Sequence, residues 1–167
     1  LHGDPVVRPL HEWRLDAAVG DRTAESITGE ACAIAGPKSL WRKGVSGTCL
    51  QFDGYNTRVS LPAAKASAIS QALTLEAWCV IGAYPWNWCP LVQQGDDDGY
   101  FLGIDGHGHP GFKLKVGDTW QELVGTETLE RSSWHHLVGT YDSASGMMSL
   151  FVEGQLAASQ SAGTAGI

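Results

Sequence analysis

Apolar and polar residues alternate along much of the chain, which is the pattern of strands that turn one face to a core. The clearest alternation runs from residue 73 to residue 81. One face of that segment would carry Leu73, Leu75, Ala77, Cys79 and Ile81. Its other face would carry Thr74, Glu76, Trp78 and Val80. A second alternation, at 148–152, would turn Met148, Leu150 and Val152 inward, so both segments are predicted to be half-buried strands.

About eleven segments of this kind, separated by Gly, Asp and Pro, are expected to be strands. They are residues 11–16, 32–35, 48–53, 58–61, 73–81, 91–94, 100–105, 111–116, 121–124, 135–141 and 148–152. The best helical pattern, at 63–72, predicts either a short helix or a structured loop. Because nothing supplies the crossover helices of a parallel sheet, the chain is predicted to be an all-β antiparallel sandwich or barrel.

The length of 167 residues suits one domain with a two-layer core. Residues 1–10 are expected to be an irregular lead-in, and residues 161–167 a small, polar tail. The net charge of −7 disfavours nucleic acid as a partner, because an acidic surface repels phosphate. No apolar run reaches the roughly 18 residues of a membrane span, so no membrane insertion is expected. Any secretion signal would have been removed or would precede Leu1.

The four cysteines are Cys32, Cys49, Cys79 and Cys89, and no two of them form a Cys-x-x-Cys pair. A zinc knuckle is therefore not expected. Cys79 and Cys89 lie on successive predicted strands and are the most suitable disulfide pair. The alternative is that the cysteines are small, buried apolar residues without a bridge.

Three segments resemble the laminin-G-like jelly-roll family, part of the concanavalin A-like lectin and glucanase superfamily. They are GTCLQFDGYNTRVSL at 47–61, LTLEAWCV at 73–80, and WHHLVGTYD at 134–142 followed by MSLFVEG at 148–154. The resemblance implies a two-sheet antiparallel jelly-roll sandwich over residues 11–160. Nothing after Gly154 is similar to the family's final strand, so either the sequence stops short of it or another segment completes the sheet.

An enzyme is not expected. Catalytic members of the superfamily carry carboxylates at alternate positions of one strand, but Glu76 stands alone on its strand, and Glu122, Glu127 and Glu130 are spaced five and three apart. There is no Gly-x-Ser-x-Gly elbow. His135 and His136 are neighbours on a strand and would point to opposite faces. The pair His107 and His109 could hold a metal, but a plain solvated turn is the favoured interpretation.

The segment Tyr84-Pro85-Trp86-Asn87-Trp88 joins two predicted strands and is expected to be an exposed loop. Aromatic rings beside an amide suit sugars, whose C–H faces stack on the rings, and Trp120 would add a second platform. Tyr84, Trp86, Asn87, Trp88 and Trp120 are therefore the candidate ligand-binding residues. The alternative is that these rings cap the sandwich or pack on a neighbouring domain. Trp13, Trp78 and Trp134, in regular strands, are expected in the core.

Many laminin-G-like domains bind calcium, and by resemblance Asp53, in the Phe-Asp-Gly turn, is the candidate metal ligand. Calcium needs six to eight oxygens, and the sequence offers only one or two here. The run of Asp residues at 96–98 is a separate possibility, although such runs are usually solvated.

The expected function is a non-catalytic carbohydrate-binding or adhesion module of a larger secreted, periplasmic or cell-surface protein, with a polysaccharide or glycan as partner. The alternative is a structural accessory sandwich that packs on a catalytic domain of the same parent protein and binds no free ligand. Exposure of Trp86 and Trp88 would favour the first function, and their burial the second.

Overall fold

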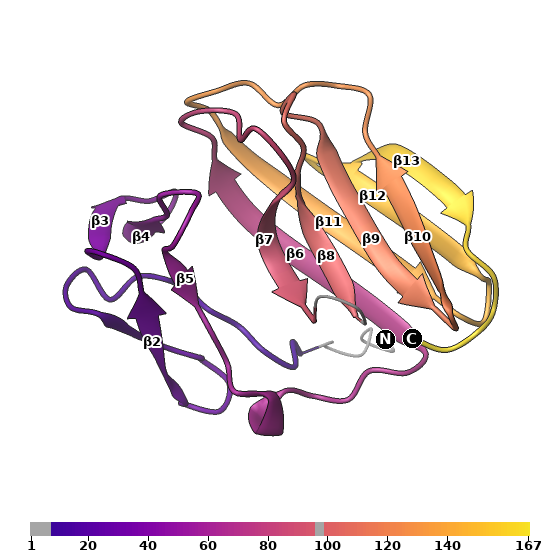
Figure 1. Cartoon of the computed structure of the whole chain (residues 1–167), viewed down its shortest axis with the longest axis horizontal. Helices are drawn as coiled ribbons and strands as arrows, with labels where there is room; N and C mark the ends of the chain where they lie inside the picture. Colours follow the sequence, from indigo (N-terminus) through magenta and orange to yellow (C-terminus); the bar gives the residue numbers. More distant parts are fainter. Residues whose placement is uncertain (1–7, 96–98) are drawn as a thin grey trace, which may run out of the picture. The chain divides into compact units, whose positions relative to one another are not determined.

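The computed structural model describes residues 8–95 and 99–167 (Figure 1). The chain divides into two compact units, residues 1–67 and residues 68–167. In the described residues, regular structure consists of β strands and one 3-10 helix, η1 (Ala63–Lys65). The prediction of an all-β antiparallel fold is therefore confirmed.

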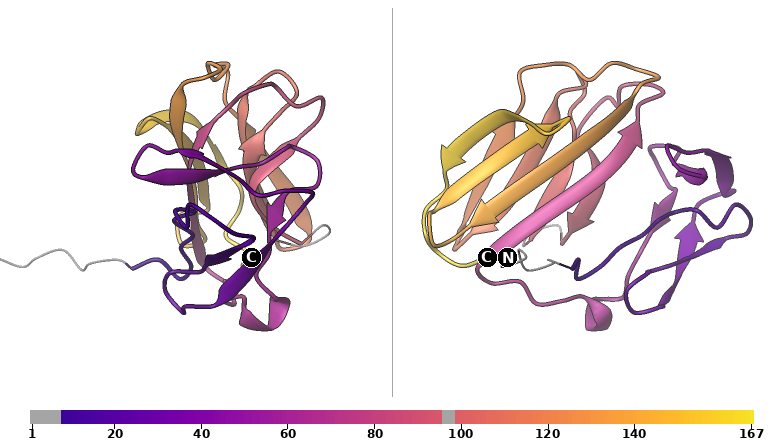
Figure 2. Two further views of the ribbon diagram at one scale, coloured as in Figure 1. Left: turned by 90° about the vertical axis from the view of Figure 1, so that its left-hand side faces the viewer. Right: turned by 180° about the vertical axis from the view of Figure 1, so that it is seen from behind.

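The second unit is a sandwich of two antiparallel four-stranded sheets (Figures 1 and 2). The front sheet has the order β10-β9-β8-β7, and the back sheet has the order β13-β12-β11-β6. The front strands are β7 (Cys89–Gln94), β8 (Tyr100–Ile104), β9 (Pro110–Val116) and β10 (Thr119–Val124). The back strands are β6 (Ala72–Val80), β11 (Trp134–Asp142), β12 (Met147–Val152) and β13 (Gln155–Ser161).

The core lies between these two sheets. Leu102, Phe112 and Leu114 of the front sheet are fully buried. The back sheet contributes Leu137 and Leu150, which are also fully buried. Each such side chain stabilises the fold by about 1.5–3 kcal/mol relative to an exposed one. The core is therefore built from the alternate residues of every long strand, as a sandwich requires.

Strand β6 confirms the predicted alternation. Leu73 and Leu75 are buried, as is Ile81 just after the strand, whereas Glu76 and Val80 are exposed. The nine residues of β6 pair without irregularity with β11, from Ala72 opposite Asp142 to Val80 opposite Trp134.

The expectation that Trp78 lies in the core is wrong, because its side chain is 51% exposed. Position 78 belongs to the outward set of β6, and the period of two outweighs the tendency of a large aromatic ring to be buried. Trp13 and Trp134 are half-buried.

Strand β13 was not predicted, because its residues Gln155–Ser161 are small or polar except Leu156 and show no apolar alternation. It forms through its hairpin with β12, where Glu153 and Gly154 both have positive φ (50° and 74°). Two successive residues with positive φ are the signature of a turn that matches the twist of the strands. After β13 the chain is irregular but held in place, since the Tyr141 hydroxyl lies 2.9 and 2.6 Å from the carbonyl oxygens of Gly163 and Ala165, which share its single proton.

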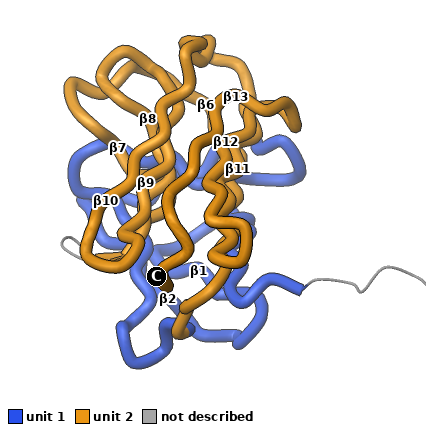
Figure 3. The backbone as a smooth tube through the Cα atoms, turned by 90° about the vertical axis from the view of Figure 1, so that its right-hand side faces the viewer, with its two compact units in different colours: residues 1–67 blue, residues 68–167 orange. Residues whose placement is uncertain are grey.

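The described strands of the first unit, which is blue in Figure 3, are all short. A three-stranded sheet has the order β1-β2-β5, and β3 pairs with β4. The strands are β1 (Arg22–Ala24), β2 (Ala31–Ala35), β3 (Leu40–Lys43), β4 (Thr48–Gln51) and β5 (Arg58–Val59). The predicted strand at 11–16 is absent, and the helical pattern at 63–72 produces only the single turn η1.

Glu25 organises the turn between β1 and β2. Its carboxylate is fully buried and accepts hydrogen bonds from the backbone N–H groups of Glu12, Ile27 and Thr28 and from the Thr28 hydroxyl. Burial by itself raises the pKa of Glu25, but these hydrogen bonds outweigh it and lower that pKa to about 2. One charged side chain therefore links the segment before β1 to the turn after it.

Candidate functional site

The predicted aromatic loop lies at one end of the sandwich, with the β8–β9 turn and the β10–β11 loop. The Tyr84 hydroxyl donates a hydrogen bond to the Leu129 carbonyl at 2.8 Å, and the N–H of Leu129 bonds the Gly108 carbonyl. The Tyr84 ring lies against Gly108, where a Cβ would collide with it. Of the five candidate residues, Tyr84 thus serves as the anchor that joins the three loops.

Trp86 is the most exposed large apolar side chain among the described residues, at 91%. Its backbone lies against Gly106, and a Cβ on that glycine would come within 3.3 Å of the Trp86 carbonyl. The Asn87 side-chain oxygen accepts a hydrogen bond from the N–H of Trp88 at 2.8 Å, which shapes the end of the loop. The loop therefore has a packed backbone and presents the Trp86 ring to solvent.

Trp88 lies on the outer face of the front sheet. Its six-membered ring covers Gly111, and it meets Phe101 edge-on at 5.6 Å between ring centroids with an 88° interplanar angle. The Nζ atom of Lys113 lies 3.8 Å from the centre of the Trp88 ring, a cation–π contact. Trp88 is half-buried by these contacts, whereas the neighbouring Trp86 is not.

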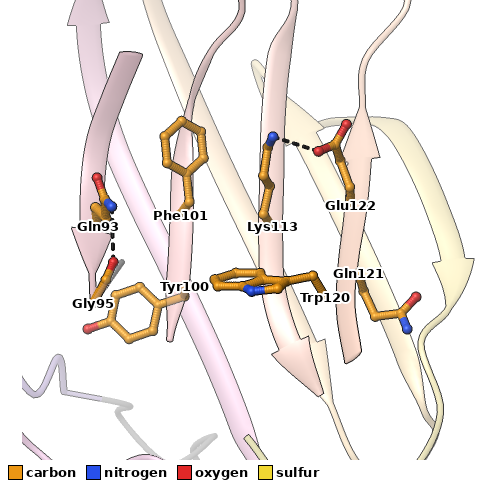
Figure 4. Close-up of a pocket in the computed structure, with 8 residues that line it drawn as sticks. All are labelled: Gln93, Gly95, Tyr100, Phe101, Lys113, Trp120, Gln121 and Glu122. Carbon is orange, nitrogen blue, oxygen red and sulfur yellow. Dashed lines mark hydrogen bonds and ion pairs between the residues drawn. The ribbon is translucent and has the colours of Figure 1, made fainter. Parts of the chain in front are cut away.

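A cavity of about 330 Å³ lies on the same outer face (Figure 4). It is lined by Gln93, Gly95, Tyr100, Phe101, Lys113, Trp120, Gln121 and Glu122. The sheet register explains this set, because Gln93 lies opposite Phe101, Phe101 opposite Lys113, and Lys113 opposite Glu122. These four residues form one row across all four strands.

An ion pair and the position of one aromatic ring shape the cavity. Lys113 Nζ and Glu122 Oε2 form an ion pair at 2.6 Å. The Trp120 ring, 42% exposed, extends across the face of β9 toward Tyr100 (Figure 4). The structure thus places Trp120 on the cavity wall, with Trp88 beside Phe101 and Lys113 in the adjoining part of the same face.

Sequence reasoning missed Phe101, Lys113 and Glu122 as site residues. The signal was present in the period of two: each alternates with core residues, and Gly103 and Gly111 leave room on the outward side. Phe101 shows why the signal is weak, since it is only 9% exposed although it lies outside the core cluster. Its partner Trp88 comes from a loop, which alternation cannot place.

The carboxylates considered for catalysis have separate partners. Glu76 binds His136 Nε2 at 2.9 Å, Glu122 binds Lys113, and Glu130 accepts a hydrogen bond from the Ser133 hydroxyl. His135 and His136, as neighbours on β11, contact Glu153 and Glu76 respectively through their rings. The ring of His109 binds Asp105 at 3.0 Å, and its centroid lies 6.1 Å from that of His107.

Asp53 lies in the first unit, in the turn between β4 and β5. Its Oδ1 atom accepts hydrogen bonds from the N–H groups of Thr57, Tyr55 and Asn56 at 2.8–2.9 Å. These bonds lower the pKa of Asp53 to about 2. One carboxylate oxygen is thus engaged by the turn itself, and a calcium ion at this turn would need several further oxygens.

Within residues 8–95 and 99–167, no group of three or more His, Cys, Asp or Glu is arranged to hold a metal ion. The Asp run at 96–98 lies outside the described residues. Calcium binding therefore stays a prediction.

All four cysteines are free, so the Cys79–Cys89 bridge is not formed. Burial, and then the charge of Glu153, raise the pKa of Cys79 to about 11. Among the described residues, no helix is long and apolar enough to cross a membrane.

Comparisons with solved structures show what the fold resembles. The binding domain of botulinum neurotoxin DC in complex with rat synaptotagmin II has a TM-score of 0.60 at 14% identity, covering 86% of this chain and 38% of that chain. The same domain in complex with SialylT has a TM-score of 0.58 at 13% identity, covering 85% and 37%. Residues 221–444 of an S-layer domain-containing protein from Clostridium thermocellum have a TM-score of 0.53 at 15% identity, covering 90% and 71%.

The chain thus spans less than two fifths of either toxin structure, and at these identities the likeness concerns the fold alone. No curated protein matches the chain. A model of the family described as "Concanavalin A-like lectin/glucanases superfamily", of laminin-G type, matches residues 53–167. This match covers most of the chain, including the whole sandwich, and it confirms the resemblance found in the sequence. The chain belongs to the laminin-G-type family of the concanavalin A-like lectin/glucanases superfamily.

Proposed function

We propose that this chain is a non-catalytic carbohydrate-binding module of a larger secreted or cell-surface protein. The glycan would bind on the outer face of the front sheet and extend toward the aromatic loop. Trp120 and Trp86 would stack on sugar rings, while Gln93, Lys113 and Glu122 would bond sugar hydroxyls.

The observation that carries the proposal is the cavity of about 330 Å³ between the exposed Trp120 ring and polar side chains from β7, β9 and β10. Ligand sites combine apolar or aromatic walls with a few polar groups that fix orientation, and about 300 Å³ is the lower end of their size range. Both kinds of group are present here on regular strands, which hold them in place without a ligand.

The complexes of similar structures support the same class of ligand. The toxin binding domain was solved with SialylT. A structure of botulinum neurotoxin type C, whose cell entry depends on two ganglioside molecules, matches this chain with a TM-score of 0.56 at 12% identity. Those ligands belong to those proteins. They support a glycan as the ligand class that we propose for this chain.

Trp86 adds support, since an indole that is 91% exposed at the end of a packed loop has no role in the core. The absence of catalysis is part of the proposal. Glu76 and Glu122 lie on different sheets, and each is paired with a base, so these two carboxylates do not face each other as a nucleophile and an acid.

A second function is favoured by the outer face of the back sheet. Trp78, Val80 and Leu156 are 51%, 44% and 58% exposed there, which is the composition of a surface that packs on protein. In that case the module would dock on another domain of the same parent protein.

Intrinsic Trp fluorescence titrated against a panel of neutral and acidic polysaccharides tests the proposal. We expect a saturable fluorescence shift in the wild-type chain. The affinity derived from it should fall at least about tenfold in Trp120→Ala and by less in Trp86→Ala, because each variant removes one stacking face. Trp78→Ala is the matched control, as it removes an equally exposed indole from the opposite sheet. Weakening by Trp78→Ala alone would transfer the function to the back sheet, and no response to any sugar would refute carbohydrate binding.

A further inference from the structure

We propose that the ion pair between Lys113 and Glu122 makes the front-sheet cavity selective for uncharged sugar residues and excludes carboxylated ones. This inference rests on the proposed function, since it names the class of glycan that the same site takes. Four observations support it: the ion pair lies in the middle of the site, Lys113 already has partners, the other described lining residues are uncharged, and the cavity is small.

The pair occupies the middle of the site. Lys113 of β9 and Glu122 of β10 are directly opposite in the ladder, and their charged atoms are 2.6 Å apart. The Lys113 side chain is 21% exposed and that of Glu122 is 47% exposed. Any ligand in the cavity therefore meets the carboxylate at least as readily as the ammonium.

The positive charge of Lys113 is already shared among fixed partners. Glu122 lies on one side of the ammonium, and the ring centres of Trp88 and Phe101 lie 3.8 and 5.8 Å away. An incoming carboxylate would have to displace Glu122 or approach it within a few ångströms. Either choice is unfavourable, because two like charges at such a distance repel each other strongly in a partly desolvated site.

Among the lining residues that the structure describes, those other than Lys113 and Glu122 are uncharged. Gln93 and Gln121 supply amide groups, and Tyr100 and Trp120 supply aromatic faces. Lys115 lies opposite Trp120 in the ladder but does not line the cavity. The whole chain carries a net charge of −7, which also disfavours anions at long range. Amides and a neutralised ion pair bind hydroxyl groups as both donors and acceptors.

The size of the cavity limits the bound portion. A volume of about 330 Å³ lies near the lower end of the range for small-molecule sites, so it suits a single sugar residue. Residues on either side of that sugar would lie along the sheet surface. The selectivity therefore concerns the one residue that enters the cavity beside Lys113 and Glu122.

The test uses ligand pairs that differ by one charged group per sugar. Suitable probes are β-1,4-linked mannan oligosaccharides against mannuronate oligomers, and cello-oligosaccharides against their C6-oxidised forms. Binding is measured by calorimetry or fluorescence at low and high salt. For the wild-type chain we expect the neutral member of the pair that binds best to bind at least about tenfold more tightly than its acidic partner.

Glu122→Gln keeps the shape of the side chain but releases the charge of Lys113. We expect this variant to lose most of the discrimination, and its binding of the acidic partner to become sensitive to salt. Glu127→Gln is the matched control, because it makes the same change in net charge at an exposed loop position outside the cavity. It should leave the discrimination unchanged. Thermal melts of all three proteins establish that each is folded.

Three outcomes would overturn the inference, and they differ in whether carbohydrate binding itself is also refuted. Equal or tighter wild-type binding of acidic members would refute the selectivity but keep carbohydrate binding. Unchanged discrimination in Glu122→Gln would refute the role of the ion pair alone. Failure of every neutral and acidic probe would remove both the inference and the proposed function.

Discussion

The ammonium group of Lys113 lies 3.8 Å from the centre of the Trp88 ring, on the outer face of the front sheet. One residue comes from the middle of strand β9 and the other from the loop that precedes β7. Their contact connects the aromatic loop to the cavity, because Lys113 also forms the ion pair with Glu122. The loop and the cavity are thus parts of one continuous surface.

One added methyl group at position 111 would occupy the space in which the Trp88 ring packs. A Cβ at position 111 would collide with the six-membered ring of Trp88, so Gly111→Ala should displace the indole and break its contact with Lys113. We expect a loss of about 1–3 kcal/mol in the free energy of unfolding and a red shift of the Trp emission. Gly82→Ala is the control, since a Cβ there meets nothing within 4 Å. Equal effects of the two variants would contradict the described packing of Trp88.

The buried carboxylate of Glu25 makes the first unit sensitive to acid. Its pKa in the folded chain is about 2, below the ordinary 4.5, so the unfolded chain binds this proton more readily. The stabilisation is complete above about pH 4.5 and is lost as the pH falls toward 2. In Glu25→Gln we expect the free energy of unfolding at pH 7 to fall by about 2 kcal/mol and to depend less on pH in that window. Parallel pH profiles for the two proteins would refute this role of Glu25.

Asp53 provides a test that separates a turn from a calcium site. Because Oδ1 accepts three backbone N–H groups, Asp53→Ala should lower the melting temperature both with calcium and with a chelator. Asp53→Asn keeps an acceptor oxygen and should lower it less. A melting temperature that rises with calcium in the wild-type chain, but not in Asp53→Asn, would instead identify Asp53 as a calcium ligand.

The thiol of Cys79 should react slowly. Burial and then Glu153 raise its pKa to about 11, and burial also raises the pKa of Cys89, so both are protonated at neutral pH. We expect iodoacetamide to label these two residues only slowly at pH 7, and much faster in denaturant. Mass spectrometry after a timed reaction identifies the modified residues. Fast labelling of Cys79 in the folded chain would show that it is more exposed than described.

Much of the fold follows from local pattern. The strands at 73–81 and 148–152 were predicted from alternation, and their inward residues belong to the core or pack against it. Alternation is reliable there because a long strand in a sandwich buries one face and exposes the other, whatever its neighbours. Strand β13 escaped prediction because its residues carry little apolar signal, and its pairing depends on β12.

The site divides in the same way. The sequence by itself determined that residues 84–88 form an aromatic loop, that long strands surround it, and which residues of those strands share a face, because these properties depend on neighbours along the chain. Only the tertiary structure decided that Trp88 folds onto Gly111 while Trp86 stays exposed, and that Lys113 binds Glu122 beside Trp120. Those contacts join residues from different strands and loops, and sheet register and side-chain packing, which no local pattern encodes, bring them together.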